Sequence, residues 1–101
     1  MVDITVQELK KRMDEGDTDF TFIDVREPHE YAEFNLGAKL IPLGNIMAAA
    51  DNELVDLKDK EIILHCRSGA RSGQAQQLLM MMGFKNVRNL IGGVVAWSEM
   101  K

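Results

Sequence analysis

The sequence predicts an α/β fold in which a small parallel sheet of four to five strands carries helices on both faces. Short apolar runs of strand length alternate along the whole chain with segments of helical periodicity, and this alternation is typical of parallel sheets. The length of 101 residues leaves room for one hydrophobic core. We therefore expect a single domain that covers residues 1–101.

The first helix is expected over residues 6–15. Thr5 and Glu8 have the spacing of a capping box at its start, and Gly16 breaks the pattern at its end. Residues 20–25 follow as a run of aromatic and β-branched side chains, which favours a strand. The chain is thus expected to begin with a helix that leads into a strand of the sheet.

The two prolines of the chain mark the boundaries of predicted elements in its middle. Pro28 suits the first turn of a short helix over residues 28–34, because its fixed backbone angle fits that position. A brief strand is expected over residues 39–41, where Pro42 stops it, and a helix over residues 43–50 follows.

The second half of the chain contains the clearest signals. The apolar run 61–65 predicts a buried strand, and apolar residues at helical spacing predict a helix over residues 70–82 with Gly83 as its C-cap. A further strand over residues 86–90 and a short helix over residues 94–100 complete the alternation.

Composition excludes several classes of function. The net charge of −4 gives no electrostatic basis for binding nucleic acid. No apolar run reaches the roughly 20 residues of a membrane span, and the N-terminus lacks the features of a signal peptide. We therefore expect a cytoplasmic protein without membrane contact, and a monomer because no exposed apolar stripe demands a partner.

Cysteine and histidine are scarce in this chain. One cysteine excludes an internal disulfide and an internal resolving thiol, and with only two histidines it makes a structural zinc site implausible. We expect no metal and no organic cofactor. Any covalent intermediate on sulfur must then be discharged by another molecule.

The single cysteine, Cys66, directly follows the predicted strand 61–65 and precedes the predicted helix 70–82. Ligands of parallel sheets bind at the carboxyl ends of the strands, and the backbone N–H groups of such a turn form an anion cradle that also favours thiolate over thiol. We therefore predict an active-site loop with Cys66 as the nucleophile and an anionic substrate, made of Cys66, Arg67, Ser68, Gly69, Ala70, Arg71 and Ser72.

The two arginines of the loop have different expected roles. Arg67 is best placed to meet the oxygens of an incoming anion, whereas Arg71 either binds the anion or pairs with a carboxylate that holds the shape of the loop. His65 precedes Cys66 in the strand, so its side chain is expected on the opposite face and not in catalysis. Asp24 is expected to cap a helix or pair with an arginine, and Arg26 to pair with Glu30 four residues on.

Three segments in order along the chain resemble the single-domain rhodaneses, which are similar to thiosulfate sulfurtransferase. They are Asp24-Val25-Arg26-Glu27 with Glu30-Tyr31, the loop from Cys66 to Ser72, and Leu90-Ile91-Gly92-Gly93-Val94-Val95-Ala96-Trp97. The resemblance implies a rhodanese-like fold and a sulfurtransferase. It departs from the family at one place, where Asn35 stands at the position of a common histidine and the segment before Gly37 is one residue shorter.

The resemblance also implies a mechanism and its partners. Cys66 would take the outer sulfur of thiosulfate or a similar donor as a persulfide, and cyanide or a thiol would then remove that sulfur. One alternative is a carrier that delivers the persulfide sulfur to a partner protein. A cysteine phosphatase or arsenate reductase is less favoured, because four residues separate Cys66 from Arg71 and phosphatase loops have one more.

Overall fold

The computed structural model describes residues 3–100 and contains the predicted parallel sheet. Its four strands lie in the order β2-β1-β3-β4, and every pair in this order is parallel. The fold class inferred from the alternating pattern is thereby confirmed. The strands are β1 (Thr21–Asp24), β2 (Lys39–Leu40), β3 (Glu61–His65) and β4 (Asn86–Asn89).

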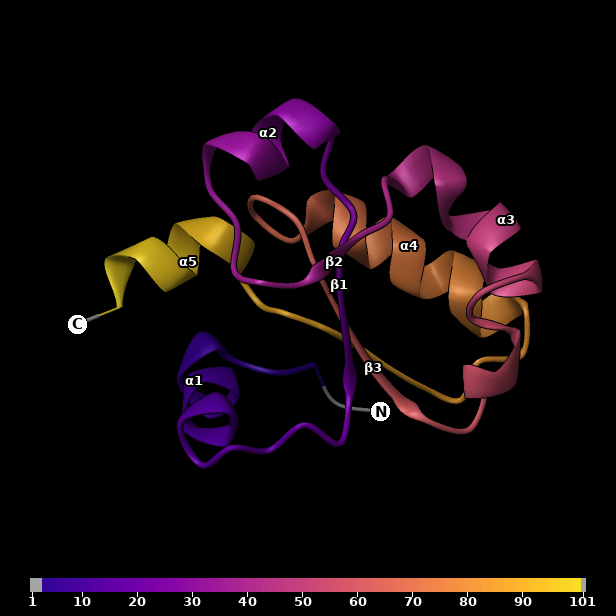
Figure 1. The fold of residues 1–101 in the computed structure, drawn as a ribbon, viewed down its shortest axis with the longest axis horizontal. Coiled ribbons are helices and arrows are strands. Elements are labelled where there is room, and N and C mark those ends of the chain that lie inside the picture. The colour runs from indigo at the N-terminus through magenta and orange to yellow at the C-terminus, as the bar shows by residue number, and fades with distance from the viewer. Residues whose placement is uncertain (1–2, 101) are drawn as a thin grey trace.

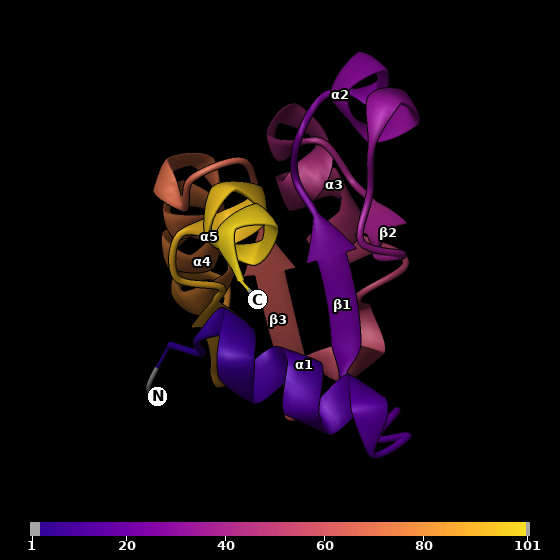
Figure 2. The same cartoon turned by 90° about the vertical axis from the view of Figure 1, so that its left-hand side faces the viewer.

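Helices cover both faces of the sheet. In Figure 2, α1 and α5 lie in front of the strands, α3 and α4 lie behind them, and α2 lies beyond the end of β1. The predicted helix 43–50 begins as a 3-10 turn, and a second 3-10 turn between α3 and β3 was not predicted. The helical elements are α1 (Val6–Asp14), α2 (Pro28–Glu33), η1 (Leu43–Asn45), α3 (Ile46–Asp51), η2 (Val55–Leu57), α4 (Ala70–Met81) and α5 (Gly93–Glu99).

The alternation of side chains along β3 builds two separate cores. Ile62 and Leu64 point into the core beneath α3 and α4, which also contains Cys66. Ile63 points into the smaller core beneath α1 and α5, which Trp97 partly covers. Both faces of the central strand are buried, as expected for a parallel sheet with helices on both sides.

The predicted capping box fixes the start of α1. The Thr5 hydroxyl accepts from the Glu8 backbone N–H at 3.1 Å, and the Glu8 carboxylate accepts from the Thr5 N–H at 3.3 Å. Just before it, Ile4 pairs with Leu90 beyond the end of β4. The N-terminal segment is thus attached to the same edge of the sheet from which α5 departs.

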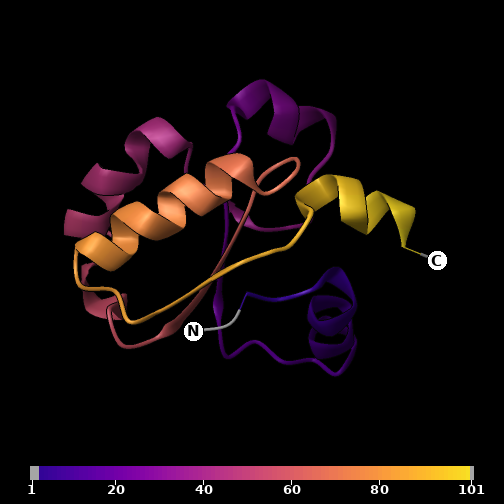
Figure 3. The ribbon, with the colours of Figure 1, turned by 180° about the vertical axis from the view of Figure 1, so that it is seen from behind.

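The carboxyl ends of β1 and β3 lie side by side, because Asp24 and His65 are partners in the register. The loop that follows β3 emerges beside them and lies between α2 and the start of α5 (Figures 1 and 3). The described helices are all too short or too polar to cross a lipid bilayer. The fold therefore brings the predicted cysteine loop to one edge, where two helices from distant parts of the chain meet it.

Candidate active site

The Cys66 sulfur lies at the centre of a curled loop. Gly69 donates its backbone N–H to the sulfur at 3.1 Å, and Ser72 approaches it with both its N–H and its hydroxyl at 3.4 Å. Gly69 has a φ of 108°, a left-handed conformation that glycine adopts without strain. The loop thus wraps donors around a side chain that is only 1 % exposed.

These donors control the ionisation of the cysteine. Burial is the largest single influence and opposes the thiolate, but hydrogen bonds from Ser72, Gly69 and the Ser68 N–H together outweigh it. The pKa of the Cys66 thiol is therefore lowered from its ordinary value. A larger thiolate fraction near neutral pH makes the sulfur a better nucleophile.

The first turn of α5 holds the loop in this shape. Val94 donates its N–H to the Cys66 carbonyl at 3.0 Å, and Val95 donates to the Arg67 carbonyl at 2.9 Å. In a planar trans peptide the carbonyl and the next N–H point in opposite directions. Turning the Arg67 carbonyl toward α5 therefore aims the Ser68 N–H at the sulfur.

Close approach of α5 to the loop depends on Gly93. A Cβ at this position would lie 2.3 Å from the Cys66 carbonyl oxygen, and the φ of Gly93 is 52°. In the sequence, Gly92 and Gly93 lie between a predicted strand and a predicted helix, and no role in the site was predicted for them. Their contribution to the site could not be recognised, because it depends on which loop α5 meets.

Arg71 reaches away from the sulfur to α2. Its guanidinium donates to both carboxylate oxygens of Glu30, at 2.7 and 2.9 Å. Arg71 holds the pKa of Glu30 at about 2, with help from the N–H of Glu27. Of the two roles left open for Arg71, the geometry supports the pairing that holds the loop, and the expected Arg26–Glu30 pair is wrong because Arg71 occupies that carboxylate.

Arg26 has a different partner from the one expected. It is buried and donates to Asp24 through Nε and Nη2 at 2.8 to 3.1 Å, and to the Phe34 carbonyl at 2.6 Å. Asp24 is fully buried, and a buried carboxylate needs such a partner. The expectation that Asp24 pairs with an arginine or caps a helix matches this arrangement.

His65 ends the central strand β3, and its ring packs on the opposite face of the sheet from Cys66. Its ring packs against Phe22 with centroids 5.0 Å apart, and its Nδ1 lies 3.4 Å from the Cys66 carbonyl oxygen. Burial is the main cause that lowers its pKa, so the ring is neutral near pH 7. The geometry agrees with the expectation of a packed histidine.

Arg67 is the exposed cation of the loop. It lines an open hollow of about 480 Å³ that faces α2. Within residues 3–100, no hydrogen bond or ion pair holds its guanidinium. Ser68 and Ala70 are also exposed, on either side of Gly69. The other residues around the hollow are Arg26, His29, Glu30, Glu33, Phe34 and Val94.

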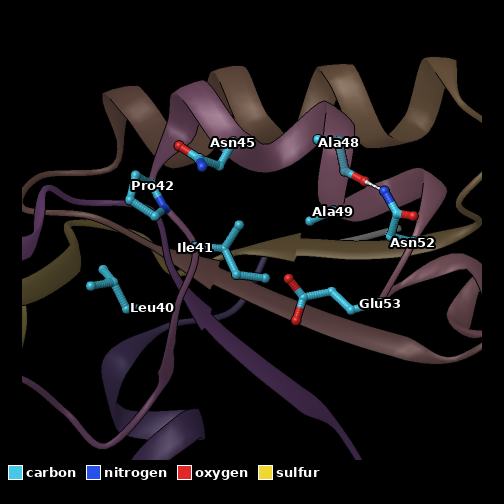
Figure 4. A pocket seen from close by; sticks show the side chains of 8 residues that line it. All are labelled: Leu40, Ile41, Pro42, Asn45, Ala48, Ala49, Asn52 and Glu53. Carbon is cyan, nitrogen blue, oxygen red and sulfur yellow. Dashed lines mark hydrogen bonds between the residues drawn. The ribbon is translucent and has the colours of Figure 1, made fainter.

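The shortened segment before Gly37 is held by Asn35. Its side chain accepts from the Gly37 N–H at 2.9 Å and donates to the Tyr31 carbonyl at 3.2 Å. These bonds close the end of α2 with Asn35 in place of the histidine that the family resemblance led us to expect. A second hollow, of about 240 Å³ between β2 and α3 (Figure 4), is lined by no residue of the cysteine loop.

Asn89 at the end of β4 also contacts the loop. Its side chain accepts from the Ser72 hydroxyl at 2.6 Å and donates to the Gly69 carbonyl at 3.1 Å. The sequence predicted Asn89 only as a strand residue.

In the described part of the chain, no cluster of histidine, cysteine or carboxylate side chains could hold a metal ion.

Comparison with known proteins identifies the family. The rhodanese-like domain model matches residues 5–100. The chain belongs to the rhodanese-like family. A sulfurtransferase from Allochromatium vinosum is 33% identical over 97 residues, which are 96% of this chain and 88% of that protein.

Two further rhodanese relatives differ in what surrounds the shared region. A putative sulfur carrier protein of Bacillus subtilis, YrkF, is 35% identical, over 95% of this chain but only 50% of that protein. The solution structure of the rhodanese-like domain of the Alr3790 protein from Anabaena sp. superposes with a TM-score of 0.86 at 30% identity, over 96% of this chain and 73% of that one.

We predict that Gly93→Ala destabilises the protein by about 2 kcal/mol or more, since a left-handed backbone costs a residue with a Cβ about 1–2 kcal/mol and overpacking adds about 1–3. Urea unfolding measures the loss. Gly44→Ala is the matched control, because a Cβ there meets nothing within 4 Å. Equal stability of the two variants would contradict the proposed close contact between α5 and the loop.

The Glu30–Arg71 pair predicts a pH dependence of stability. The folded pKa of about 2 lies below the ordinary value of 4.5, so the pair stabilises the protein above pH 4.5 and this stabilisation is lost as the pH falls from 4.5 toward 2. In Glu30→Gln the free energy of unfolding should fall less over this range than in the wild type. Glu33→Gln, an exposed change on the same helix, should follow the wild-type curve.

Proposed function

We propose that the protein is a sulfurtransferase that moves a sulfane sulfur from thiosulfate or a similar anionic donor to a thiol or cyanide, through a persulfide on Cys66. The observation that carries the proposal is the ring of donors around the Cys66 sulfur. These donors stabilise a thiolate before transfer and a persulfide anion after it, as fixed dipoles do in an oxyanion hole.

The first half-reaction forms the persulfide. The Cys66 thiolate attacks the outer sulfur of thiosulfate, a new sulfur–sulfur bond forms, and sulfite leaves with the electron pair of the broken bond. Arg67 at the edge of the hollow supports the anionic donor, because its guanidinium is exposed and no carboxylate holds it in the described structure. Arg71 holds the loop to α2, and the donors of Ser68, Gly69 and Ser72 surround the sulfur.

The second half-reaction needs an acceptor from outside, since the chain has no second cysteine. An acceptor thiolate attacks the outer sulfur, and Cys66 leaves as a thiolate. A carrier role with a protein as acceptor uses the same chemistry, and the similarity to a putative sulfur carrier protein favours it as the second candidate. Thiosulfate turnover that is slow beside transfer from a protein persulfide would favour the carrier.

The first experiment is intact-mass measurement after brief thiosulfate treatment and desalting. We expect a gain of one sulfur, about 32 Da, that cyanide removes with release of thiocyanate. Cys66→Ser should stay folded and gain nothing. Sulfur uptake by the Cys66→Ser variant would overturn the persulfide mechanism.

We predict that Arg67→Ala raises the KM for thiosulfate about tenfold or more, because a charge-assisted hydrogen bond is worth about 1.5–3 kcal/mol. Steady-state kinetics with cyanide as acceptor measure the change. Lys60→Ala removes an exposed cation far from the loop and should leave KM as it is. An unchanged KM in Arg67→Ala would remove Arg67 from donor binding.

A further inference from the structure

The Ser72 hydroxyl lies between two acceptors. Its oxygen is 2.6 Å from Asn89 Oδ1 and 3.4 Å from Cys66 Sγ. A hydroxyl carries one proton, so it can donate to only one of them at a time. Ser72 is fully buried, so its hydroxyl donates to one acceptor or the other without competition from bulk water.

The orientation of the Asn89 amide follows from its second contact. Its Nδ2 faces the Gly69 carbonyl at 3.1 Å. A carbonyl oxygen only accepts, so the amide nitrogen must face Gly69 and the amide oxygen must face Ser72. The short distance to Oδ1 then assigns the hydroxyl proton to Asn89.

We propose that Asn89 is a positioning residue for Cys66, because its amide oxygen competes with the Cys66 sulfur for the single proton of the Ser72 hydroxyl. While the sulfur is a thiol, the hydroxyl donates to Asn89 and its oxygen accepts the S–H. When the sulfur is a thiolate, the hydroxyl turns from Asn89 to the sulfur. Asn89 thereby stabilises the thiol form and limits how acidic Cys66 becomes.

This exchange rests on the proposed function and has a place in the transfer cycle. When an acceptor thiolate forms its bond to the outer sulfur, the sulfur–sulfur bond to Cys66 breaks and the electron pair stays on Sγ. The Ser72 proton turns toward that new anion, and returns to Asn89 when Sγ is next protonated. No oxidant or reductant enters, because the sulfur passes from one thiolate to another.

The second contact of Asn89 adds little to the shape of the loop. The Gly69 carbonyl also accepts from the Gly73 N–H at 2.9 Å, so the start of α4 stays closed when the Asn89 side chain is removed. The Asn89 backbone N–H donates to the Asp3 carboxylate at 3.0 Å and keeps the end of β4 in place. The effect of Asn89 on the sulfur is therefore expected to pass mainly through Ser72.

Several other charged or titratable side chains lie near Cys66, and their electrostatic influence on the sulfur does not pass through Asn89. In the described structure no hydrogen bond joins these side chains to the side chains of Asn89 or Ser72; Arg26 bonds to Asp24, Arg71 bonds to Glu30, and the guanidinium of Arg67 is exposed without a partner. They are Asp24 and Arg26 at the end of β1, His65 in β3, Arg67 in the loop and Arg71 in α4.

The test is the pH profile of Cys66 alkylation by iodoacetamide, which reports the thiolate and does not require sulfur transfer. In Asn89→Ala the freed hydroxyl donates to the sulfur, and we expect the midpoint to fall by about half a pH unit, or about a threefold faster rate below it. When Asn89→Ala is added to the Ser72→Ala variant, the midpoint should not change. Asn86→Ala is the matched control on the same strand, since Asn86 Oδ1 has no hydrogen-bond partner in the described structure.

No shift in Asn89→Ala, or an equal shift with and without Ser72, would overturn the competition. If Asn89→Ala does not fold, Asn89→Asp serves instead, because its carboxylate holds the Ser72 proton more tightly and should raise the midpoint more with Ser72 present than in Ser72→Ala. Sulfur uptake by mass is measured on the same proteins. A wild type that takes up no sulfur while the alkylation shifts persist would refute the proposed function and leave the role of Asn89 standing.

Discussion

The outward orientation of the loop carbonyls is the constraint on which the site depends. Cys66 and Arg67 turn their carbonyls toward the N–H groups of Val94 and Val95, and Gly69 turns its carbonyl toward α4 and Asn89. Since carbonyl and N–H point in opposite directions across a peptide plane, the outward Arg67 carbonyl leaves the Ser68 N–H facing the sulfur. The donors around the sulfur come from the loop and the start of α4, while helix α5 and Asn89 in β4 hold the loop carbonyls that face away from it.

The hydrogen bonds between α5 and the loop satisfy polar backbone groups of both segments. The first turn of a helix has N–H groups without partners inside the helix, and the curled loop has carbonyls without partners of its own. Their pairing buries both sets at no cost in unsatisfied polar groups. It also explains why Gly92 and Gly93, at the start of α5, are in direct contact with a loop more than twenty residues earlier in the chain.

Local signals in the sequence were sufficient to predict most of the fold. They could not identify which residues far apart along the chain become partners. The capping box at Thr5 and Glu8 and the cysteine after strand 61–65 are short-range patterns, and the structure contains both features. Glu30 has two arginines within reach once the chain is folded, and only the fold shows that Arg71 reaches it while Arg26 turns to Asp24. Asn89 carried no signal, because its partners lie on a loop and a helix that meet β4 only in three dimensions.

Helix α2 lines the hollow beside the cysteine loop and is attached to the rest of the protein mainly by polar contacts. None of its residues is buried; it is held by a capping box, by the Arg26 contact to the Phe34 carbonyl and by the Glu30–Arg71 pair. Its outward side chains therefore carry little of the packing energy that fixes core residues. Substitutions of these outward side chains should have small effects on folding, so that the wall beside the cysteine loop can change in sequence while the loop keeps its shape.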